Sequence, residues 1–447
     1  MDFHWLYTSK DRRTQLIKKN VLVGFGVRGI NILSSLLLVP LTIDYISNEL
    51  YGIWLTLSSI IHWIGFFDIG FGNGLRNKLA ESIAVGDYIR GRTYVSTTYV
   101  ILMLIFIAIG IISYWGAEYI NWSAFLKVSD EYNPILVIVS QILLISFSLQ
   151  MILKLIQNIL QAYQLIAIAS FLDTLGNIFS LIFIYILTLT VAPNLPLIAI
   201  AFSFTPLFVL MGASMFFFRG KFKNISPCSD FVKLNCIKEL FQLGGGFFII
   251  QIATVVLYQM INILISRMCG PEQVTNYNIS YKYLSILLMI MTVIVSPMWS
   301  AFTDAYTKGE YSWMKKIYKK LLIMSGISAF SMACMIIVSP IVYDFWIGNN
   351  VYISLTTTFL VAFYVLILIW GMIHSFLLNG MSKIYVQLCY SVITMVLFIP
   401  LATFLGTEYG LNGILLSMIL INTPGSFLSF YQVKILLSKK AKGIWNK

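Results

Sequence analysis

The chain alternates long apolar runs with short polar segments, and this pattern extends from residue 20 to residue 436. A helix of about 20 mostly apolar residues crosses the hydrocarbon core of a bilayer, and a longer run crosses it with some tilt. Twelve runs are long enough, so we expect an all-α integral membrane protein with twelve membrane-spanning helices. The expected spans are 20–46, 51–72, 94–115, 134–158, 165–190, 195–218, 240–266, 274–302, 321–343, 354–378, 384–405 and 410–436.

Composition agrees with this interpretation. Of the 447 residues, 59% are hydrophobic and 11% are charged, and the mean hydropathy is +0.85. A soluble protein carries about 25% charged residues. The N-terminal residues 1–19 are polar and basic and lead into no signal cleavage site, so we expect the first span to act as the insertion signal. The five cysteines lack metal-ligand spacing and are interpreted as reduced packing residues.

Basic residues gather in alternate connections between the spans. With a cytoplasmic N-terminus, 26 of the 30 Lys and Arg residues lie on the cytoplasmic side, many of them in basic loops at 73–93, 219–239 and 303–320. The opposite orientation would place these residues on the translocated side, which membrane insertion disfavours. We therefore expect both termini in the cytoplasm. The net charge of +12 then reflects topology and not a surface for nucleic acid.

The two halves of the chain resemble each other at an offset of 223 residues. At this offset Gly86-Asp87-Tyr88 falls on Gly309-Glu310-Tyr311, and three further charged positions match without a gap. Six spans, an even number, separate the copies, so both halves have the same orientation in the membrane. We predict two six-helix lobes, 1–223 and 224–447, related by a parallel repeat around a central cavity.

Two charged residues lie well inside the first two spans. Arg28 stands about 12 Å from the cytoplasmic end of its helix, at ~1.5 Å per residue, and Asp68 lies in the inner half of the next span. Charges within a membrane are costly and need a partner or a purpose. The two residues either line a cavity that binds substrate or form a structural ion pair near the inner mouth, with snorkelling of Arg28 as a further alternative.

Other polar groups inside spans are weaker candidates. Asp173 and Lys154 both lie toward the cytoplasmic side, and Lys282 lies about eight residues from the outer face. Asp173 and Lys282 could face a cavity, whereas a lysine at the end of a span, such as Lys154, is usually an anchor. His62 and His374 are interpreted as hydrogen-bonded packing residues, with proton coupling as the alternative.

Two segments of the first half resemble a known family of transporters. The segments are PLTIDYISNELYGIWLTLSSII (40–61) and FFDIGFGNGLRNKLAESIAVGDY (66–88), with weaker echoes in PEQVTNYNISYKY and TKGEY of the second half. They are similar to the oligosaccharide-lipid flippases of bacterial polysaccharide synthesis, the O-antigen transporter group. That group shares a superfamily with the multidrug and toxin extrusion transporters.

The resemblance implies a fold, a substrate and a place in the cell. The fold would be two six-helix bundles in a V, with alternating access for a polyprenyl-diphosphate oligosaccharide in the bacterial cytoplasmic membrane. Arg28 and Lys282 could supply the cationic cavity of the family, while Asp68 and Asp173 depart from a purely cationic one. Membrane lipid, a polysaccharide polymerase and glycosyltransferases are the implied partners. No cofactor is implied, and a coupling ion, H⁺ or Na⁺, stays unidentified.

Two other function classes compete with the flippase. A cation-coupled multidrug exporter of the same fold would use Asp68 and Asp173 to hold a cation. A membrane glycosyltransferase or polymerase would need an extended outer catalytic loop. The longest outer loop, 116–133, is short and holds no catalytic set, and no nucleotide-binding or nucleophile motif occurs in the chain, so we do not expect an enzyme.

Overall fold

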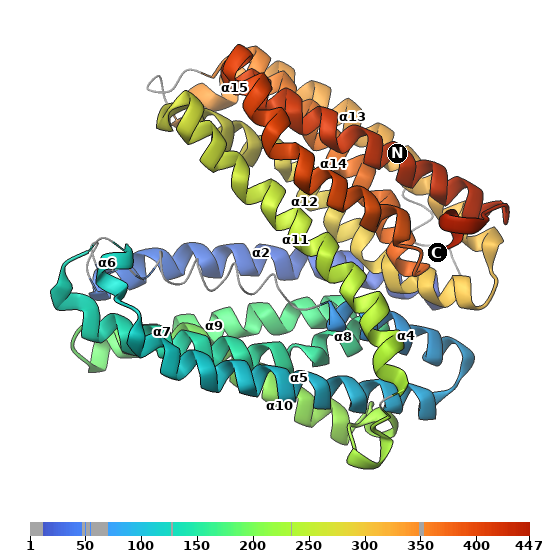
Figure 1. The fold of residues 1–447 in the computed structure, drawn as a ribbon, viewed down its shortest axis with the longest axis horizontal. Helices are drawn as coiled ribbons and strands as arrows, with labels where there is room; N and C mark the ends of the chain where they lie inside the picture. The colour runs from blue at the N-terminus through green and yellow to red at the C-terminus, as the bar shows by residue number, and fades with distance from the viewer. Residues whose placement is uncertain are drawn as a thin grey trace. The chain divides into compact units, whose positions relative to one another are not determined.

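The computed structural model describes residues 12–46, 50, 54, 70–126, 128–233, 235–347 and 353–447. Every secondary-structure element in these ranges is a helix, so the predicted all-helical class is confirmed (Figure 1). Nine of the described helices are long and apolar enough to cross a membrane. The expected second span, 51–72, lies almost wholly outside the described residues. The count of twelve spans therefore stays a prediction.

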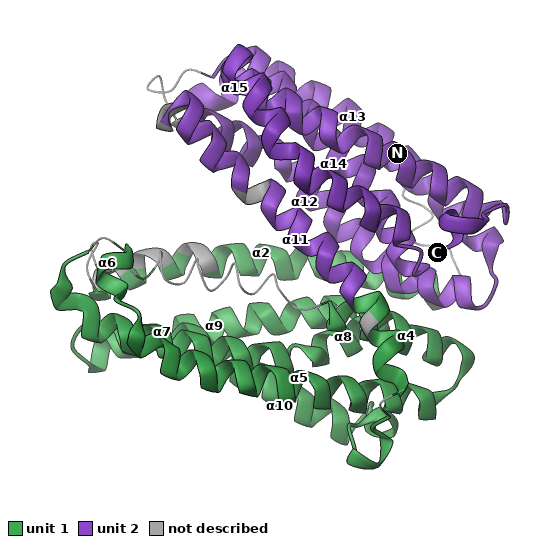
Figure 2. Ribbon diagram, viewed as in Figure 1, with its two compact units in different colours: residues 1–244 green, residues 245–447 purple. Residues whose placement is uncertain are grey.

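The chain divides into two compact units, residues 1–244 and 245–447 (Figure 2). In the first unit, α2 packs against α9, α9 against α10, α10 against α7 and α7 against α5. The main helices of this unit are α2 (Arg12–Ile46), α4 (Phe71–Val85), α5 (Tyr88–Gly116), α7 (Asn133–Leu153), the short α8 (Leu155–Ala162), α9 (Ile166–Thr190) and α10 (Leu195–Arg219). The connection between α5 and α7, predicted to lie on the outer side, holds three short helices, η1 (Ala117–Tyr119), α6 (Trp122–Leu126) and η2 (Asp130–Tyr132).

The segment 73–93, expected as a basic loop, is mostly helical. Glycines in the left-handed conformation flank α4, with φ of 68° at Gly70 and 78° at Gly86. Leu75 and Leu79 are fully buried on one face of the helix, one turn apart. Arg76 lies on the same buried side, and its Nη1 donates a hydrogen bond to Gln161 Oε1 over 3.0 Å. Burial lowers the pKa of the Arg76 guanidinium to about 9, so it stays protonated at neutral pH.

The basic connection after α10 packs onto the first unit. It contains two short turns, η3 (Lys223–Ile225) and η4 (Ser229–Phe231), and Phe222 and Ile225 are fully buried. The Nε of Arg92 donates to the Ser226 carbonyl over 2.9 Å, which ties the connection to the start of α5. The compact unit therefore reaches Gly244, 21 residues beyond the predicted lobe boundary at 223. The boundary of the lobes as moving bodies stays a prediction.

Five long helices make up the rest of the chain. They are α11 (Asn235–Cys269), which begins in the first unit, α12 (Pro271–Thr307), α13 (Tyr311–Ile347), α14 (Leu355–Gly380) and α15 (Tyr385–Leu437). Within the second unit α14 packs against α12, α13 and α15. The 53-residue α15 is two helices joined at Gly410, whose φ of 57° and ψ of −137° interrupt the helix. This break separates the two spans expected at 384–405 and 410–436. A short turn, η5 (Gly443–Asn446), follows.

The predicted repeat has a structural counterpart at two turns. Gly86 and Gly309 both adopt a positive φ, 78° and 71°, and each donates its N–H over 3.1 Å to the carbonyl three residues earlier. The next residue, Asp87 or Glu310, donates its N–H over 2.9 Å to the carbonyl five residues earlier in both turns. The two copies matched at an offset of 223 residues therefore share one backbone geometry. This agreement supports an internal repeat.

Candidate functional site

Arg28 lies exposed on α2, a helix that is apolar along most of its length. Within the described part of the chain, its guanidinium makes no hydrogen bond and no ion pair. Asp68, its predicted partner, lies outside the described residues, as does His62. The pairing of Arg28 with Asp68 stays a prediction.

Asp173 and Lys154 lie in the same region of the first unit. Asp173 is exposed on α9, and its Oδ1 accepts a hydrogen bond of 2.8 Å from Nε2 of the buried Gln157 on α8. Lys154 stands at the joint between α7 and α8 and acts electrostatically on Asp173 without a direct ion pair. The structure thus brings together these two predicted site residues.

Lys282 lies in the second unit, exposed on α12. Its ammonium makes no ion pair with any residue that the structure describes, and it does not line the cavity of that unit. Whether Arg28, Lys154, Asp173 and Lys282 contact substrate stays a prediction.

His374 is a packing residue, as interpreted from the sequence. The ring is fully buried on α14 among Trp370, Tyr318 and Phe430. Its Nδ1 is 2.6 Å from the Trp370 carbonyl, and its Nε2 is 3.1 Å from the Tyr318 hydroxyl. A carbonyl only accepts, so Nδ1 carries the proton, and Nε2 accepts from the tyrosine. Both ring nitrogens are satisfied in the neutral form.

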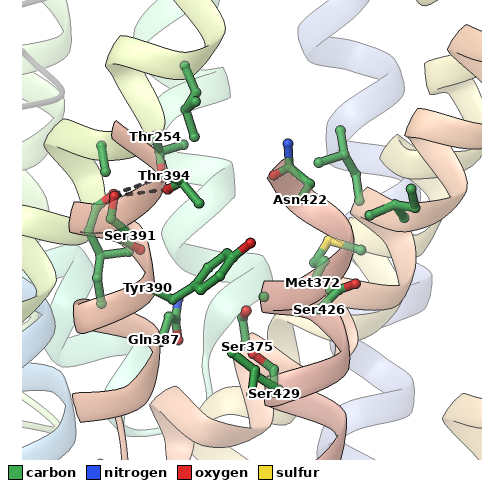
Figure 3. A pocket seen from close by; sticks show the side chains of 18 of the residues that line it. Thr254, Met372, Ser375, Gln387, Tyr390, Ser391, Thr394, Asn422, Ser426 and Ser429 are labelled. Atoms are coloured by element: carbon green, nitrogen blue, oxygen red, sulfur yellow. Dashed lines mark hydrogen bonds between the residues drawn. The ribbon is translucent and has the colours of Figure 1, made fainter. Parts of the chain in front are cut away.

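A cavity of about 400 Å³ opens inside the second unit (Figure 3). Helices α11, α12, α14 and both halves of α15 line it. Its volume falls in the range of ~300–1,000 Å³ that is usual for small-molecule sites. All of its lining residues are uncharged, and ten of them carry a hydroxyl or an amide. These ten are Thr254, Thr292, Ser375, Gln387, Tyr390, Ser391, Thr394, Asn422, Ser426 and Ser429.

Two stripes at helical spacing supply most of these polar groups. On the first half of α15 they stand at positions 387, 390, 391 and 394, and on the second half at 422, 426 and 429, with Gly425 completing the stripe. Positions i, i+3, i+4 and i+7 share one face of a helix. The site residues expected from the sequence are all charged, and none belongs to these stripes. The spacing of the uncharged polar residues is nevertheless visible in the sequence and marks one polar face on each of the last two spans.

Tyr390 projects from the first half of α15 toward the second half (Figure 3). Its hydroxyl donates a hydrogen bond of 2.5 Å to the Ile421 carbonyl. Its ring lies directly on Gly425, where an added Cβ atom would clash with Cε1 and Cδ1 of the ring. A side chain at position 425 would therefore displace the tyrosine. The absence of a side chain at Gly425 leaves room for this aromatic ring at the edge of the cavity.

The side chains of the cavity offer hydrogen bonds. The lining holds hydroxyls and amides, and none of its residues is Asp, Glu, His, Lys, Arg or Cys. Among the residues that the structure describes, no group of three or more His, Cys, Asp or Glu side chains could hold a metal ion.

The chain matches a known protein family and is similar to individual proteins of bacteria. The family of polysaccharide biosynthesis proteins matches residues 17–303. A protein of Salmonella typhimurium named "Putative O-antigen transporter" is 22% identical over 436 residues, 90% of this chain and 91% of the relative. A "Putative O-antigen export protein" of Yersinia pseudotuberculosis is 20% identical over 371 residues, 81% of this chain and 82% of the relative.

Solved structures of membrane transporters share the fold. A MATE transporter in complex with MaD3S superposes with a TM-score of 0.78 at 14% identity over 98% of both chains. A MOP superfamily transporter from Pyrococcus furiosus superposes with a TM-score of 0.76 at 12% identity, over 98% of this chain and 100% of that one. At this identity the likeness shows the fold alone.

Proposed function

Because the chain belongs to the polysaccharide biosynthesis protein family, we propose that it is a flippase for lipid-linked oligosaccharide in O-antigen or related polysaccharide synthesis. It moves a polyprenyl-diphosphate-linked oligosaccharide from the cytoplasmic to the outer leaflet of the bacterial cytoplasmic membrane. The observation that carries this proposal is the match of 90% of the chain to the Salmonella typhimurium relative. Nine helices in the described residues are long and apolar enough to cross a membrane. This number is consistent with a multi-pass transporter.

The chemistry of the substrate sets what the protein must do. A sugar diphosphate is too polar to cross hydrocarbon unaided, whereas its apolar polyprenyl tail is soluble in the hydrocarbon core of the bilayer. The protein needs a polar path for the head and an open side for the tail. With the cytoplasm negative, outward movement of an anion is favoured by about 2.3 kcal/mol per charge per 100 mV.

The exposed cations on apolar helices are the proposed contacts for the diphosphate. Arg28 is the stronger candidate, because a guanidinium binds phosphate oxygens through two parallel hydrogen bonds. Lys282 would act as a second point charge in the other half of the chain. Asp173, held by Gln157 and close to Lys154, would keep the region around it from being purely cationic.

The proposed transport cycle is alternating access. Two lobes of six spans each, with both termini in the cytoplasm, would rock between inward-facing and outward-facing states around the bound head group. Membrane glycosyltransferases must supply the substrate on the cytoplasmic side, and a polymerase must consume it on the outer side.

A cation-coupled multidrug exporter is the second candidate. The observation that favours it is the shared fold with MATE transporters. Asp173, an exposed carboxylate in the first third of the apolar helix α9, is a described residue that could bind a cation or a cationic drug.

Deletion of the gene in its native host tests the proposal. We expect surface polysaccharide to be lost and lipid-linked oligosaccharide to accumulate in the cytoplasmic leaflet, with recovery when the gene is supplied on a plasmid. Electrophoresis of surface glycan and quantification of the lipid-linked pool measure both effects. Unchanged surface glycan together with new sensitivity to cationic dyes would instead favour the multidrug exporter.

A further inference from the structure

The cavity of the second unit plays no part in binding the diphosphate as proposed above. We propose that this cavity binds a neutral sugar residue of the transported glycan, with Gln387, Tyr390 and Asn422 as its principal contacts. The identity of the glycan rests on the proposed function. The sugar subsite itself rests on the charge, hydrogen-bonding capacity and aromatic surface of the cavity.

The charge of the cavity excludes the ionic parts of the substrate. All of its lining residues are uncharged. An ion moved from water into a site without a counter-charge loses hydration free energy that uncharged hydroxyls and amides return only in part. The diphosphate and acidic sugars therefore fit poorly, and a neutral polar group fits well.

The hydrogen-bonding groups of the cavity are biased toward accepting. Six of the ten polar side chains already donate a proton to a carbonyl of their own helix or of the neighbouring half of α15. A hydroxyl that has donated in this way keeps its oxygen lone pairs for a ligand, and the amide of Asn422 keeps its oxygen lone pairs and one N–H. The six are Thr254, Thr292, Tyr390, Thr394, Asn422 and Ser426.

Gln387 adds an acceptor that has no partner. Its Oε1 is buried and makes no hydrogen bond, and its side chain lines the cavity near Tyr390 (Figure 3). Leaving a buried polar atom unsatisfied is unfavourable, so a ligand that donates to it gains affinity. Acceptors in excess call for a ligand rich in O–H donors, which describes a sugar ring and not a lipid chain or a phosphate.

Polar side chains of the first unit are paired with one another, in contrast to those of the cavity. On α2 and α9, Asn31 donates to Thr174 over 3.3 Å, and Asn177 donates to Asn31 over 3.4 Å. These side chains satisfy one another across a helix interface. In the second unit, the hydroxyls of Ser375 and Ser429 make no hydrogen bond with any described residue and line the cavity instead.

Tyr390 supplies the aromatic surface that sugar rings prefer. The hydrogen bond to the Ile421 carbonyl and the contact with Gly425 fix the orientation of its ring. A preorganised ring loses little entropy on binding and presents an apolar face to the C–H side of a pyranose. Hydroxyl acceptors around a fixed aromatic ring form a site for a neutral sugar.

Binding of simple glycosides to the full-length protein tests the inference. The protein is placed in nanodiscs free of glycolipid and of sugar-based detergent, and saturation-transfer NMR is recorded with the neutral methyl glycosides of glucose, galactose, mannose and N-acetylglucosamine. We expect at least one glycoside to bind with weak affinity and methyl glucuronide to bind at least tenfold more weakly. Tyr390→Ala and Gln387→Met should each weaken binding about tenfold, and Tyr390→Phe should retain most of it.

Matched variants separate the cavity from the helix that carries it. Thr394 and Thr403 lie on the same half of α15 and both donate to a carbonyl of their own helix, over 2.9 Å and 2.8 Å. Thr394 lines the cavity, whereas Thr403 is exposed and does not. Thr394→Val should weaken glycoside binding, and Thr403→Val should leave it unchanged. Tyr431→Ala, on an exposed tyrosine of the second half, is the control for Tyr390→Ala.

Each outcome decides the inference separately from the proposed function. Three results would overturn the sugar subsite. They are absence of glycoside binding to the wild type, equal binding by the wild type and the cavity variants, and displacement of bound glycoside by Na⁺, seen with NaCl but not with choline chloride. If the wild type restores glycan export while these results hold, the flippase stands without the subsite. If glycosides bind as expected but the wild type restores no export, the subsite stands and the flippase fails.

Discussion

Charged and uncharged polar residues behave differently in this protein. Two of the charged residues that stand out against apolar spans, Arg28 and Lys282, are exposed and make no ion pair with a described residue, whereas Asp173 accepts a hydrogen bond from Gln157. The hydroxyls and amides, which stand out far less, are the side chains that converge on a cavity. His374, the one histidine among the described residues, has both ring nitrogens hydrogen-bonded in its neutral form.

Arg28→Ala should reduce glycan export at least tenfold, since a charge-assisted hydrogen bond to phosphate contributes about 1.5–3 kcal/mol. Arg28→Lys keeps the charge and should retain part of the activity. Export is measured as surface polysaccharide per amount of protein in the membrane. The control is Arg267→Ala, an exposed arginine near the end of α11, which should export normally. Normal export by Arg28→Ala would remove this residue from the mechanism.

Gly425→Ala should destabilise the second unit by about 1–3 kcal/mol, the usual cost of overpacking. The new methyl would clash with the Tyr390 ring, so the ring must move and lose its hydrogen bond to Ile421. The thermal unfolding midpoint of purified protein measures the change.

Gly371→Ala is the matched control for this substitution. It adds a methyl to the same cavity, but its nearest neighbour is the Ser426 Cβ at an ordinary 3.4 Å. Its unfolding midpoint should equal or exceed that of the wild type. Equal midpoints for Gly425→Ala and the wild type would show that Tyr390 is not held by this contact.

The helices follow the hydrophobic pattern closely, and the connections do not. The expected spans at 94–115, 165–190 and 195–218 coincide within a few residues with α5, α9 and α10. The segment 73–93 was wrongly expected as a loop. Its charges suggested exposure, yet Leu75 and Leu79 bury one face of α4 and Arg76 is buried with them. Charge marks the side of the membrane but does not prevent a helix.

The turns at Gly86 and Gly309 should respond alike to substitution if they are copies of one element. Each glycine has a positive φ, and a side chain there costs about 1–2 kcal/mol. Gly86→Ala and Gly309→Ala should therefore lower the unfolding midpoint by similar amounts.

Helical glycines provide the controls for these turns. Gly116 and Gly326 have ordinary helical backbone, and a methyl group added at either position would meet no atom within 4 Å. Gly116→Ala and Gly326→Ala should be neutral or stabilising, because alanine is the better helix former. A loss at these positions as large as at Gly86 would contradict the assignment of strain to the turns.

At the scale of the whole molecule, the resemblance to O-antigen transporters is confirmed. The family match covers 17–303, and the Salmonella typhimurium relative aligns over about nine-tenths of both chains. The fold is shared with MATE and MOP superfamily transporters. Function differs within that fold, so the substrate must be argued from the sites and not from the architecture.

Both termini are predicted to lie in the cytoplasm. A fluorescent protein fused to either end should therefore fluoresce, because it matures there, and alkaline phosphatase fused to either end should be inactive. Alkaline phosphatase inserted after Asn121, in the predicted outer loop 116–133, should be active and serves as the control. Phosphatase activity at either terminus would reverse the topology and the direction of the proposed transport.

The amino-acid sequence alone is enough to predict the helical class, the membrane environment and the family. Lipid cannot form hydrogen bonds with the backbone, so the N–H and C=O groups of a span must bond to each other within one helix. Such a local requirement can be recognised from a run of consecutive residues. Which polar groups meet, in contrast, depends on the packing of helices against one another. Thr254, Ser375, Tyr390 and Asn422 come from α11, α14 and the two halves of α15, and their convergence depends on how these helices pack. Periodicity marks the polar face of each helix, but packing alone decides whether that face closes on another helix or opens onto a cavity.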